Sequence, residues 1–110
     1  MPNYLRNDVI LVRFPFSDLT NFKVRPGVVI NAGHSLNDLL VVPLTNKTNN
    51  LVNGEFVMTD WQGAGLNVES AVKRGIFTIH ERLVLRSVGS IGSIDLKNLE
   101  NSLRSWLDLH

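Results

Sequence analysis

The feature that most limits the fold of this chain is a series of short apolar runs, rich in β-branched residues and each interrupted by proline, glycine or polar residues. Such runs are typical of β-strands, and none approaches the ~20 apolar residues of a membrane span. Many short strands joined by short connections predict a small barrel or sandwich. The strand-like stretches are residues 8–14, 25–30, 39–45, 55–58, 70–78 and 83–91.

The C-terminal segment follows a different period. Its large apolar residues recur at spacings of three and four, which places them on one face of a helix; they are Leu96, Leu99, Leu103, Trp106 and Leu107. Ser93 precedes them as the expected N-cap, and Asp95 stands in the first turn, where a negative charge suits the helix dipole. The pattern therefore predicts a β-barrel that is closed or flanked by one amphipathic helix.

The composition sets the class of protein. The chain has 110 residues, of which 44% are apolar and 19% are charged, and this balance predicts one globular domain over residues 1–110. It has no cysteine, so disulfides and thiolate metal sites are excluded. Its three histidines lie far apart and there is no glycine-rich phosphate loop, so we expect neither a metal site nor a cofactor. The N-terminus lacks a signal-peptide pattern, which favours a cytoplasmic protein.

Positive charge is concentrated in two parts of the chain. Lysine and arginine outnumber acidic residues in residues 1–30 and in residues 70–90, although the formal net charge is only +1. If folding brings these segments together they form an anion-binding face, and otherwise they are ordinary solvated charges. Arg25 stands directly before Pro26, which favours an extended backbone. It is either an anion clamp or an edge-strand charge that discourages aggregation.

Six stretches, taken in order, resemble the MazF/PemK-type toxins of type II toxin–antitoxin systems. They are DVILVRFPFSDLT at 8–20, KVRPGVVI at 23–30, VPLT at 42–45, GLNVESAV at 65–72, FTI at 77–79 and VGSI at 88–91. The resemblance spans nearly the whole chain. It implies an SH3-like small β-barrel of the MazF/CcdB kind with a C-terminal helix, acting as a homodimer without a cofactor and bound by a cognate antitoxin.

The resemblance also implies an activity. These toxins are endoribonucleases that cut single-stranded RNA without a metal: the ribose 2′-hydroxyl attacks the adjacent phosphate and leaves a 2′,3′-cyclic phosphate and a 5′-hydroxyl. A fixed guanidinium stabilises the extra negative charge of the transition state. Since arginine remains protonated, Arg25 is expected to stabilise charge, and Thr45 to hold the same phosphate through its hydroxyl.

Four further residues are expected to bind the RNA. Lys23 and Lys47 flank the two catalytic candidates and are placed to grip the backbone. Lys73 occupies the position of an arginine found in some family members, and it can clamp phosphate without the bidentate fork. Trp61, in a long polar loop, is the candidate for stacking on a base.

One departure from the family leaves the general base open. Gly75 stands where those same family members have an aspartate, so no carboxylate is supplied there. His34 is an alternative base because its pKa lies near neutrality, whereas His80 is interpreted as structural. Two other functions remain: a CcdB-like toxin that binds DNA gyrase, and a barrel that binds its target but has lost catalysis.

Overall fold

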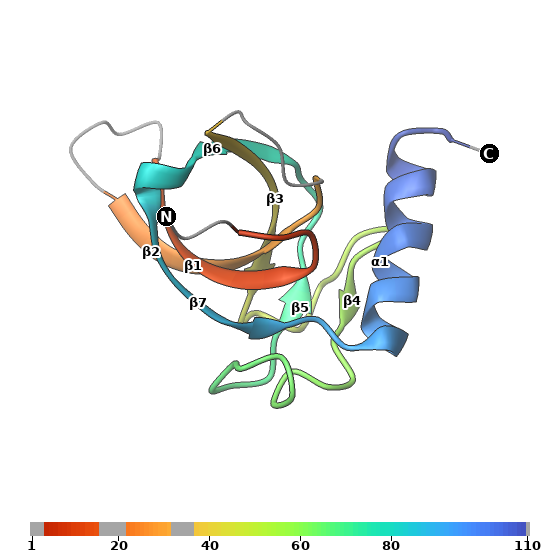
Figure 1. Cartoon of the computed structure of the whole chain (residues 1–110). Helices are drawn as coiled ribbons and strands as arrows, with labels where there is room; N and C mark the ends of the chain where they lie inside the picture. The colour runs from red at the N-terminus through yellow and green to blue at the C-terminus, as the bar shows by residue number, and fades with distance from the viewer. Residues whose placement is uncertain (1–3, 16–21, 32–36, 110) are drawn as a thin grey trace.

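The computed structural model describes residues 4–15, 22–31 and 37–109. They form a curved, antiparallel sheet beside one C-terminal helix (Figure 1). The elements are β1 (Asp8–Pro15), β2 (Phe22–Val29), β3 (Asp38–Thr45), β4 (Phe56–Val57), β5 (Ala71–Val72), β6 (Phe77–His80), the 3-10 turn η1 (Glu81–Leu83), β7 (Val84–Ser90) and α1 (Ser93–Trp106). The predicted fold class is confirmed, with one difference: the strand path β4-β5-β3-β2-β1-β7, with β6 on β3, does not close into a full barrel.

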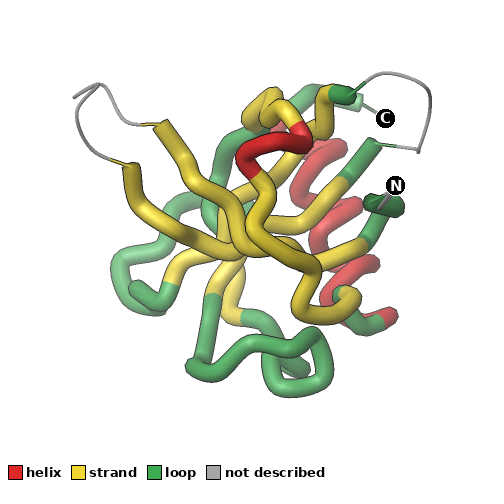
Figure 2. The backbone as a smooth tube through the Cα atoms, turned by 60° about the vertical axis from the view of Figure 1, so that its left-hand side comes forward, coloured by secondary structure: helices red, strands yellow, loops and turns green. Residues whose placement is uncertain are grey.

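The central strands are buried on both faces. Val28 and Val29 are neighbours in β2, and because side chains alternate along a strand they belong to different cores. The helix-side core consists of Val9, Val28, Val42, Leu44, Met58, Ala64, Val72, Ile91 and Leu99. The inner core consists of Ile10, Val12, Phe14, Val29, Leu39, Val41 and Ile79. Figure 2 shows α1 on one side of the strands and η1 on the other, which explains why the strand sequences are continuous apolar runs rather than alternating ones.

Bulges in the β1–β7 ladder bend this edge of the sheet. Val9 pairs with Gly89 while Ile10 pairs with Ser87, so one residue of β7 is unmatched next to Gly89. Gly65 has a φ of +91°, and a side chain at this position would collide with the carbonyl of Val88. The loop before β5 therefore lies with its backbone directly on β7.

Three local predictions were wrong. β2 begins at Phe22 rather than at Arg25, because its pairing with β1 continues to the Pro15–Phe22 pair. The stretch 70–78 is not one strand but two, β5 and β6, separated around Gly75, whose φ is +151°. Ser93 is the first helical residue rather than the cap, and the N-cap position is occupied by Gly92 without a side-chain hydrogen bond.

Asp95 lies in the first turn of α1, as its position predicts, and has a second role. Its side chain is only 1% exposed and accepts hydrogen bonds from the backbone N–H groups of Thr59 and Asp60, at 2.8 and 2.9 Å. The Thr59 hydroxyl donates a third, at 3.0 Å. The carboxylate therefore ties the loop after β4 to the first turn of α1.

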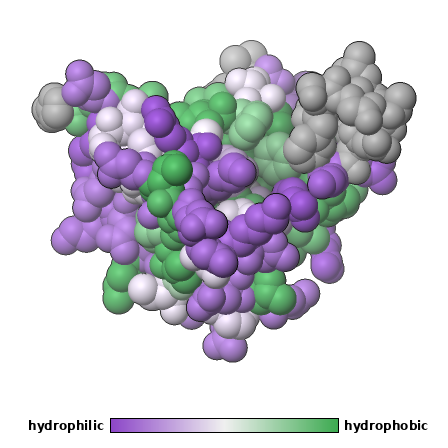
Figure 3. All heavy atoms as spheres, turned by 180° about the vertical axis from the view of Figure 1, so that it is seen from behind, coloured by the Kyte–Doolittle hydropathy of each residue, from purple (hydrophilic) through white to green (hydrophobic). Residues whose placement is uncertain are grey.

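The surface is mainly polar. On the face turned away from the viewer in Figure 1, hydrophilic residues predominate and separate smaller apolar patches (Figure 3). Exposed large apolar side chains come from several different elements, as Val24, Leu85 and Ile94 illustrate. Within the described residues, no helix combines the length and the apolar character that crossing a membrane requires.

Candidate functional site

Two prolines mark the place where the sheet opens. Pairing between β2 and β3 ends at Gly27 and Pro43, so Pro26 pairs only with Leu11 of β1. On the other side of β3, pairing with β6 ends at Val41 and pairing with β5 starts at Leu44. Since proline has no N–H to donate, each one fits a point where a neighbouring strand is missing. Beyond this point the ends of β2 and β3 border a cleft.

The cleft contains a pocket of about 340 Å³, here called the cationic pocket. Among the described residues, five cationic side chains line it and no acidic one does, which makes it a site of positive potential. Phe14 and Phe77 form an apolar wall, with their rings edge to face at a centroid distance of 5.4 Å. The lining residues are Phe14, Lys23, Arg25, Pro43, Leu44, Thr45, Asn46, Lys47, Lys73, Arg74 and Phe77.

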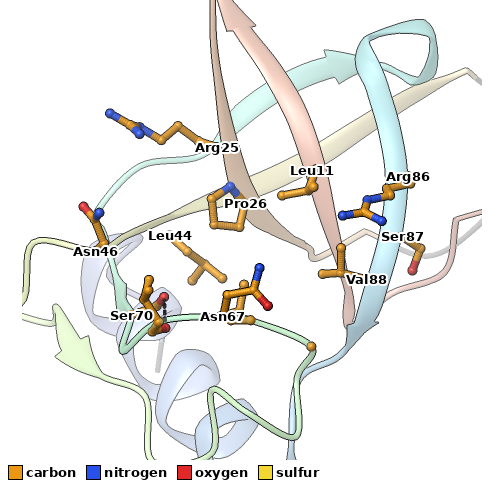
Figure 4. Close-up of a pocket in the computed structure, with 13 residues that line it drawn as sticks. Leu11, Arg25, Pro26, Leu44, Asn46, Asn67, Ser70, Arg86, Ser87 and Val88 are labelled. Carbon is orange, nitrogen blue, oxygen red and sulfur yellow. Dashed lines mark hydrogen bonds between the residues drawn. The ribbon is translucent and has the colours of Figure 1, made fainter.

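A second pocket, of about 430 Å³, adjoins the first and is here called the polar pocket. The two share Arg25, Leu44 and Asn46. Figure 4 shows Arg25 and Asn46 on one side of the polar pocket, Arg86 on the opposite side and Asn67 between them. Arg25 therefore stands at the boundary between two adjoining pockets, with a second guanidinium across the polar one.

Five of the six predicted site residues meet in the cationic pocket: Arg25, Thr45, Lys23, Lys47 and Lys73. The two basic segments of the sequence are thus brought together: β2 supplies Lys23 and Arg25, and the chain after β5 supplies Lys73 and Arg74. Sequence reasoning did not select Arg74 or Arg86, although the excess of positive charge over residues 70–90 contained the signal for both.

The structure does not bring Trp61 to this site. Its ring is partly buried and packs against the helix-side core, and it lines neither of the two pockets. The loop that carries it turns inward, with the Leu66 N–H bonded to the Trp61 carbonyl at 3.0 Å. In this position the Trp61 ring packs against the core rather than facing either pocket.

Thr45 lies at the end of β3, where its hydroxyl oxygen accepts a hydrogen bond from the Lys47 N–H at 3.1 Å. This contact is that of a threonine capping a turn. A hydroxyl accepts through its lone pairs and still has its own proton to donate. Thr45 is therefore held in place by Lys47 and keeps a donor for an anion in the cationic pocket.

The segment after β5, residues 73–75, is here called the cationic turn, and backbone bonds hold it on two sides. The Lys73 N–H donates to the Pro43 carbonyl at 3.0 Å, and the Arg74 N–H donates to Glu55 Oε2 at 2.8 Å. Partial burial raises the pKa of Glu55, but the hydrogen bonds from Arg74 and Val52 and the charges of Lys73 and Arg74 outweigh it and lower the pKa overall. The Glu55 carboxylate is ionised at neutral pH.

The described residues that line the two pockets include no carboxylate and no imidazole. Gly75 supplies none, and its φ of +151° would strain any side chain placed there. His34 lies outside the described residues. His80 lines neither pocket. Its Nδ1 accepts the Arg82 N–H at 3.0 Å and caps η1, as expected of a structural histidine. In the described chain no three His, Cys, Asp or Glu side chains are grouped as metal ligands.

The chain belongs to the family of PemK-like, MazF-like toxins of type II toxin–antitoxin systems, whose model matches residues 5–107. No curated protein sequence matches it. Its fold is similar to that of the Mycobacterium tuberculosis toxin MazF-mt6, with a TM-score of 0.73 and 18% identity over 94% of this chain and 98% of the other.

Two further solved structures share the fold. One is an endoribonuclease in complex with its cognate antitoxin from a mycobacterial species, with a TM-score of 0.77 and 16% identity over 97% of each chain. The other is an endoribonuclease from a mycobacterial species, with a TM-score of 0.74 and 17% identity over 99% of this chain and 95% of that one. The family and fold expected from the sequence motifs are confirmed.

Proposed function

We propose that this protein is a toxin endoribonuclease of a type II toxin–antitoxin system and that it cleaves single-stranded RNA at the cationic pocket. The observation that carries the proposal is the convergence of five cationic side chains and the Thr45 hydroxyl on one cleft. Phosphate contacts dominate the affinity of proteins for nucleic acid. Membership of the toxin family, and the endoribonucleases among proteins of the same fold, support this function.

In the proposed reaction the ribose 2′-oxygen forms a bond to the adjacent phosphorus as the bond from phosphorus to the 5′-oxygen breaks. The 2′-hydroxyl loses its proton, the 5′-oxygen gains one, and the products are a 2′,3′-cyclic phosphate and a 5′-hydroxyl. Arg25, at the boundary of the two pockets, stabilises the charge that builds up on the phosphate oxygens. Thr45 donates to the same phosphate, while Lys23, Lys47 and Lys73 hold neighbouring phosphates.

The assembly is part of the same proposal. We assign residues 1–110 to a single toxin domain that acts as a homodimer and whose cognate antitoxin covers the cationic pocket. The cationic pocket favours this function over gyrase binding of the CcdB kind, because a gyrase-binding toxin has no need of phosphate-binding groups. Incubating the purified protein with a mixed single-stranded RNA separates the nuclease from the two other functions, since a CcdB-like toxin and a binding-only barrel both leave the RNA intact.

We expect cleavage to continue in excess EDTA. The described residues that line the two pockets offer cations and no carboxylate or imidazole, so in the proposed reaction guanidinium and ammonium groups neutralise the negative charge of the transition state. The measurement is cleavage of a labelled single-stranded RNA with and without chelator, followed by analysis of the new ends, which should carry 5′-hydroxyls. Loss of cleavage in EDTA that magnesium restores would contradict the mechanism.

Lys73→Ala should weaken RNA binding more than it slows the chemical step. Lysine is a compact charge on a flexible stem, suited to holding phosphate in the ground state, and its loss should raise KM with kcat nearly unchanged. The slope of log K against log salt should fall by about 0.7, the value of one phosphate contact on a single strand. If turnover disappears while RNA affinity and its salt slope stay the same, Lys73 is catalytic.

A further inference from the structure

Glu55 joins two segments that are distant in the sequence. Its Oε1 accepts the Val52 N–H at 2.9 Å and its Oε2 accepts the Arg74 N–H at 2.8 Å. Its own N–H donates to the Val52 carbonyl at 2.9 Å. One carboxylate therefore closes the turn in which it lies and holds the backbone of the cationic turn.

The turn that carries Glu55 is fixed to α1. Ser102 donates its hydroxyl proton to the Gly54 carbonyl at 2.7 Å, and the Trp106 indole N–H donates to the Asn53 carbonyl at 3.0 Å. Gly54 has a φ of +87° and lies so close to the Trp106 ring that a side chain there would collide with it. The Glu55 carboxylate therefore extends from a turn that hydrogen bonds attach to α1.

On its other side, the cationic turn is attached to the sheet through the Lys73 N–H and the Pro43 carbonyl. Glu55 and Pro43 thus hold two consecutive backbone N–H groups, and the side chains of those two residues, Lys73 and Arg74, line the cationic pocket. Glu55 itself does not line the pocket. Its effect on a bound anion is exerted through the position of this turn.

We propose that Glu55 is a positioning residue that links α1 to the cationic turn and places Lys73 and Arg74 for binding to the RNA backbone; this rests on the proposed function. Its two effects on RNA have opposite signs. As a negative charge near the phosphates it opposes binding, and neutralising it should then strengthen binding. As the holder of the turn it favours binding, and neutralising it should then weaken binding.

The test is Glu55→Gln, in which the side-chain amide keeps the shape but has one acceptor oxygen where the carboxylate used two. The probe is a fluorescent single-stranded oligodeoxynucleotide of mixed sequence, which lacks the 2′-hydroxyl and cannot be cleaved. We expect its Kd to rise roughly two- to thirtyfold, the usual range for residues that act on a site without contacting the ligand. On RNA, KM should rise with kcat nearly unchanged, because Arg25 is not disturbed.

Glu69→Gln is the matched control. Glu69 is an exposed carboxylate between Val68 and Ser70 of the polar pocket, so its loss changes the charge near the site without releasing the cationic turn. We expect the oligonucleotide to bind this variant as tightly as the wild type, or more tightly. If Glu55→Gln also binds as tightly as the wild type or more tightly, Glu55 acts only as a charge and the proposal is wrong.

A second measurement does not depend on nucleic acid. Amide hydrogen exchange at Arg74 should accelerate in Glu55→Gln and stay unchanged in Glu69→Gln, because only the first replaces the charged acceptor of the 2.8 Å bond to this N–H with a neutral amide, whose single oxygen Val52 also competes for. Unchanged exchange at Arg74 would overturn the proposal even if binding fell. If the wild type neither binds nor cleaves RNA, the proposed function fails, and the exchange result still decides whether Glu55 holds the turn.

Discussion

Replacing Arg25 with alanine is expected to lower the rate of RNA cleavage by about 10²–10³-fold, as the loss of one transition-state donor does, with the protein still folded. The guanidinium is exposed at the boundary of the two pockets, so its removal leaves no cavity in either core. In the proposed reaction it stabilises the charge that develops on the phosphate. The loss should therefore appear mainly in kcat, measured by single-turnover cleavage of a labelled RNA.

Two variants serve as comparisons. Thr45→Val removes the hydroxyl at the end of β3 and should cost less than the loss of Arg25, because one neutral donor contributes less than a charged one. Arg13→Ala removes an exposed arginine from the neighbouring strand β1 that lines neither pocket, and cleavage should stay near the wild-type rate. If Arg25→Ala loses thermal stability while its folded fraction cleaves normally, Arg25 is a structural residue.

The second large effect is on stability and concerns Asp95. Asp95→Ala should reduce the free energy of unfolding by about 3 kcal/mol, because two backbone N–H groups lose a partly buried acceptor. For a domain of this size that corresponds to a fall in Tm of roughly 10–20 °C. Thermal and urea unfolding followed by circular dichroism would measure it.

Two other variants define the origin of that effect. Asp95→Asn keeps one acceptor oxygen and should lie between the alanine variant and the wild type. Asp38→Ala removes an exposed aspartate at the start of β3, and its Tm should change little. A Tm for Asp95→Ala within a few degrees of wild type would show that the loop after β4 is held by other contacts.

The strands and the helix were predictable because their patterns are local. The apolar run of β1 and the helical spacing of Leu96, Leu99 and Leu103 report burial directly. The extent of β2 was not predictable in the same way: Lys23 and Val24 are exposed, and they are strand residues only because β1 continues beside them. Pro43 is tolerated inside β3 because it lies between the part of β3 that pairs with β6 and the part that pairs with β5. No short window of sequence records where those pairings stop.

The candidate site was predicted in part for the same reason. Arg25, Thr45 and Lys73 were selected through motifs, and the fold brings them to one pocket. Trp61 was misplaced because a tryptophan in a polar loop has the same local sequence whether its ring faces water or the core. Glu55 was missed because its significance lies in a bond to Arg74, nineteen residues away.

The backbone of Gly75 has an evolutionary consequence. An aspartate at this position would have to adopt a φ of +151°, at a cost of roughly 1–3 kcal/mol, and its Cβ would lie 3.3 Å from the Phe77 ring. A domain with about 5–15 kcal/mol of total stability loses a large share of its reserve in that one step. A single mutation therefore cannot easily introduce a carboxylate at this position. The chain around residues 73–77 would have to change first, so the glycine is entrenched.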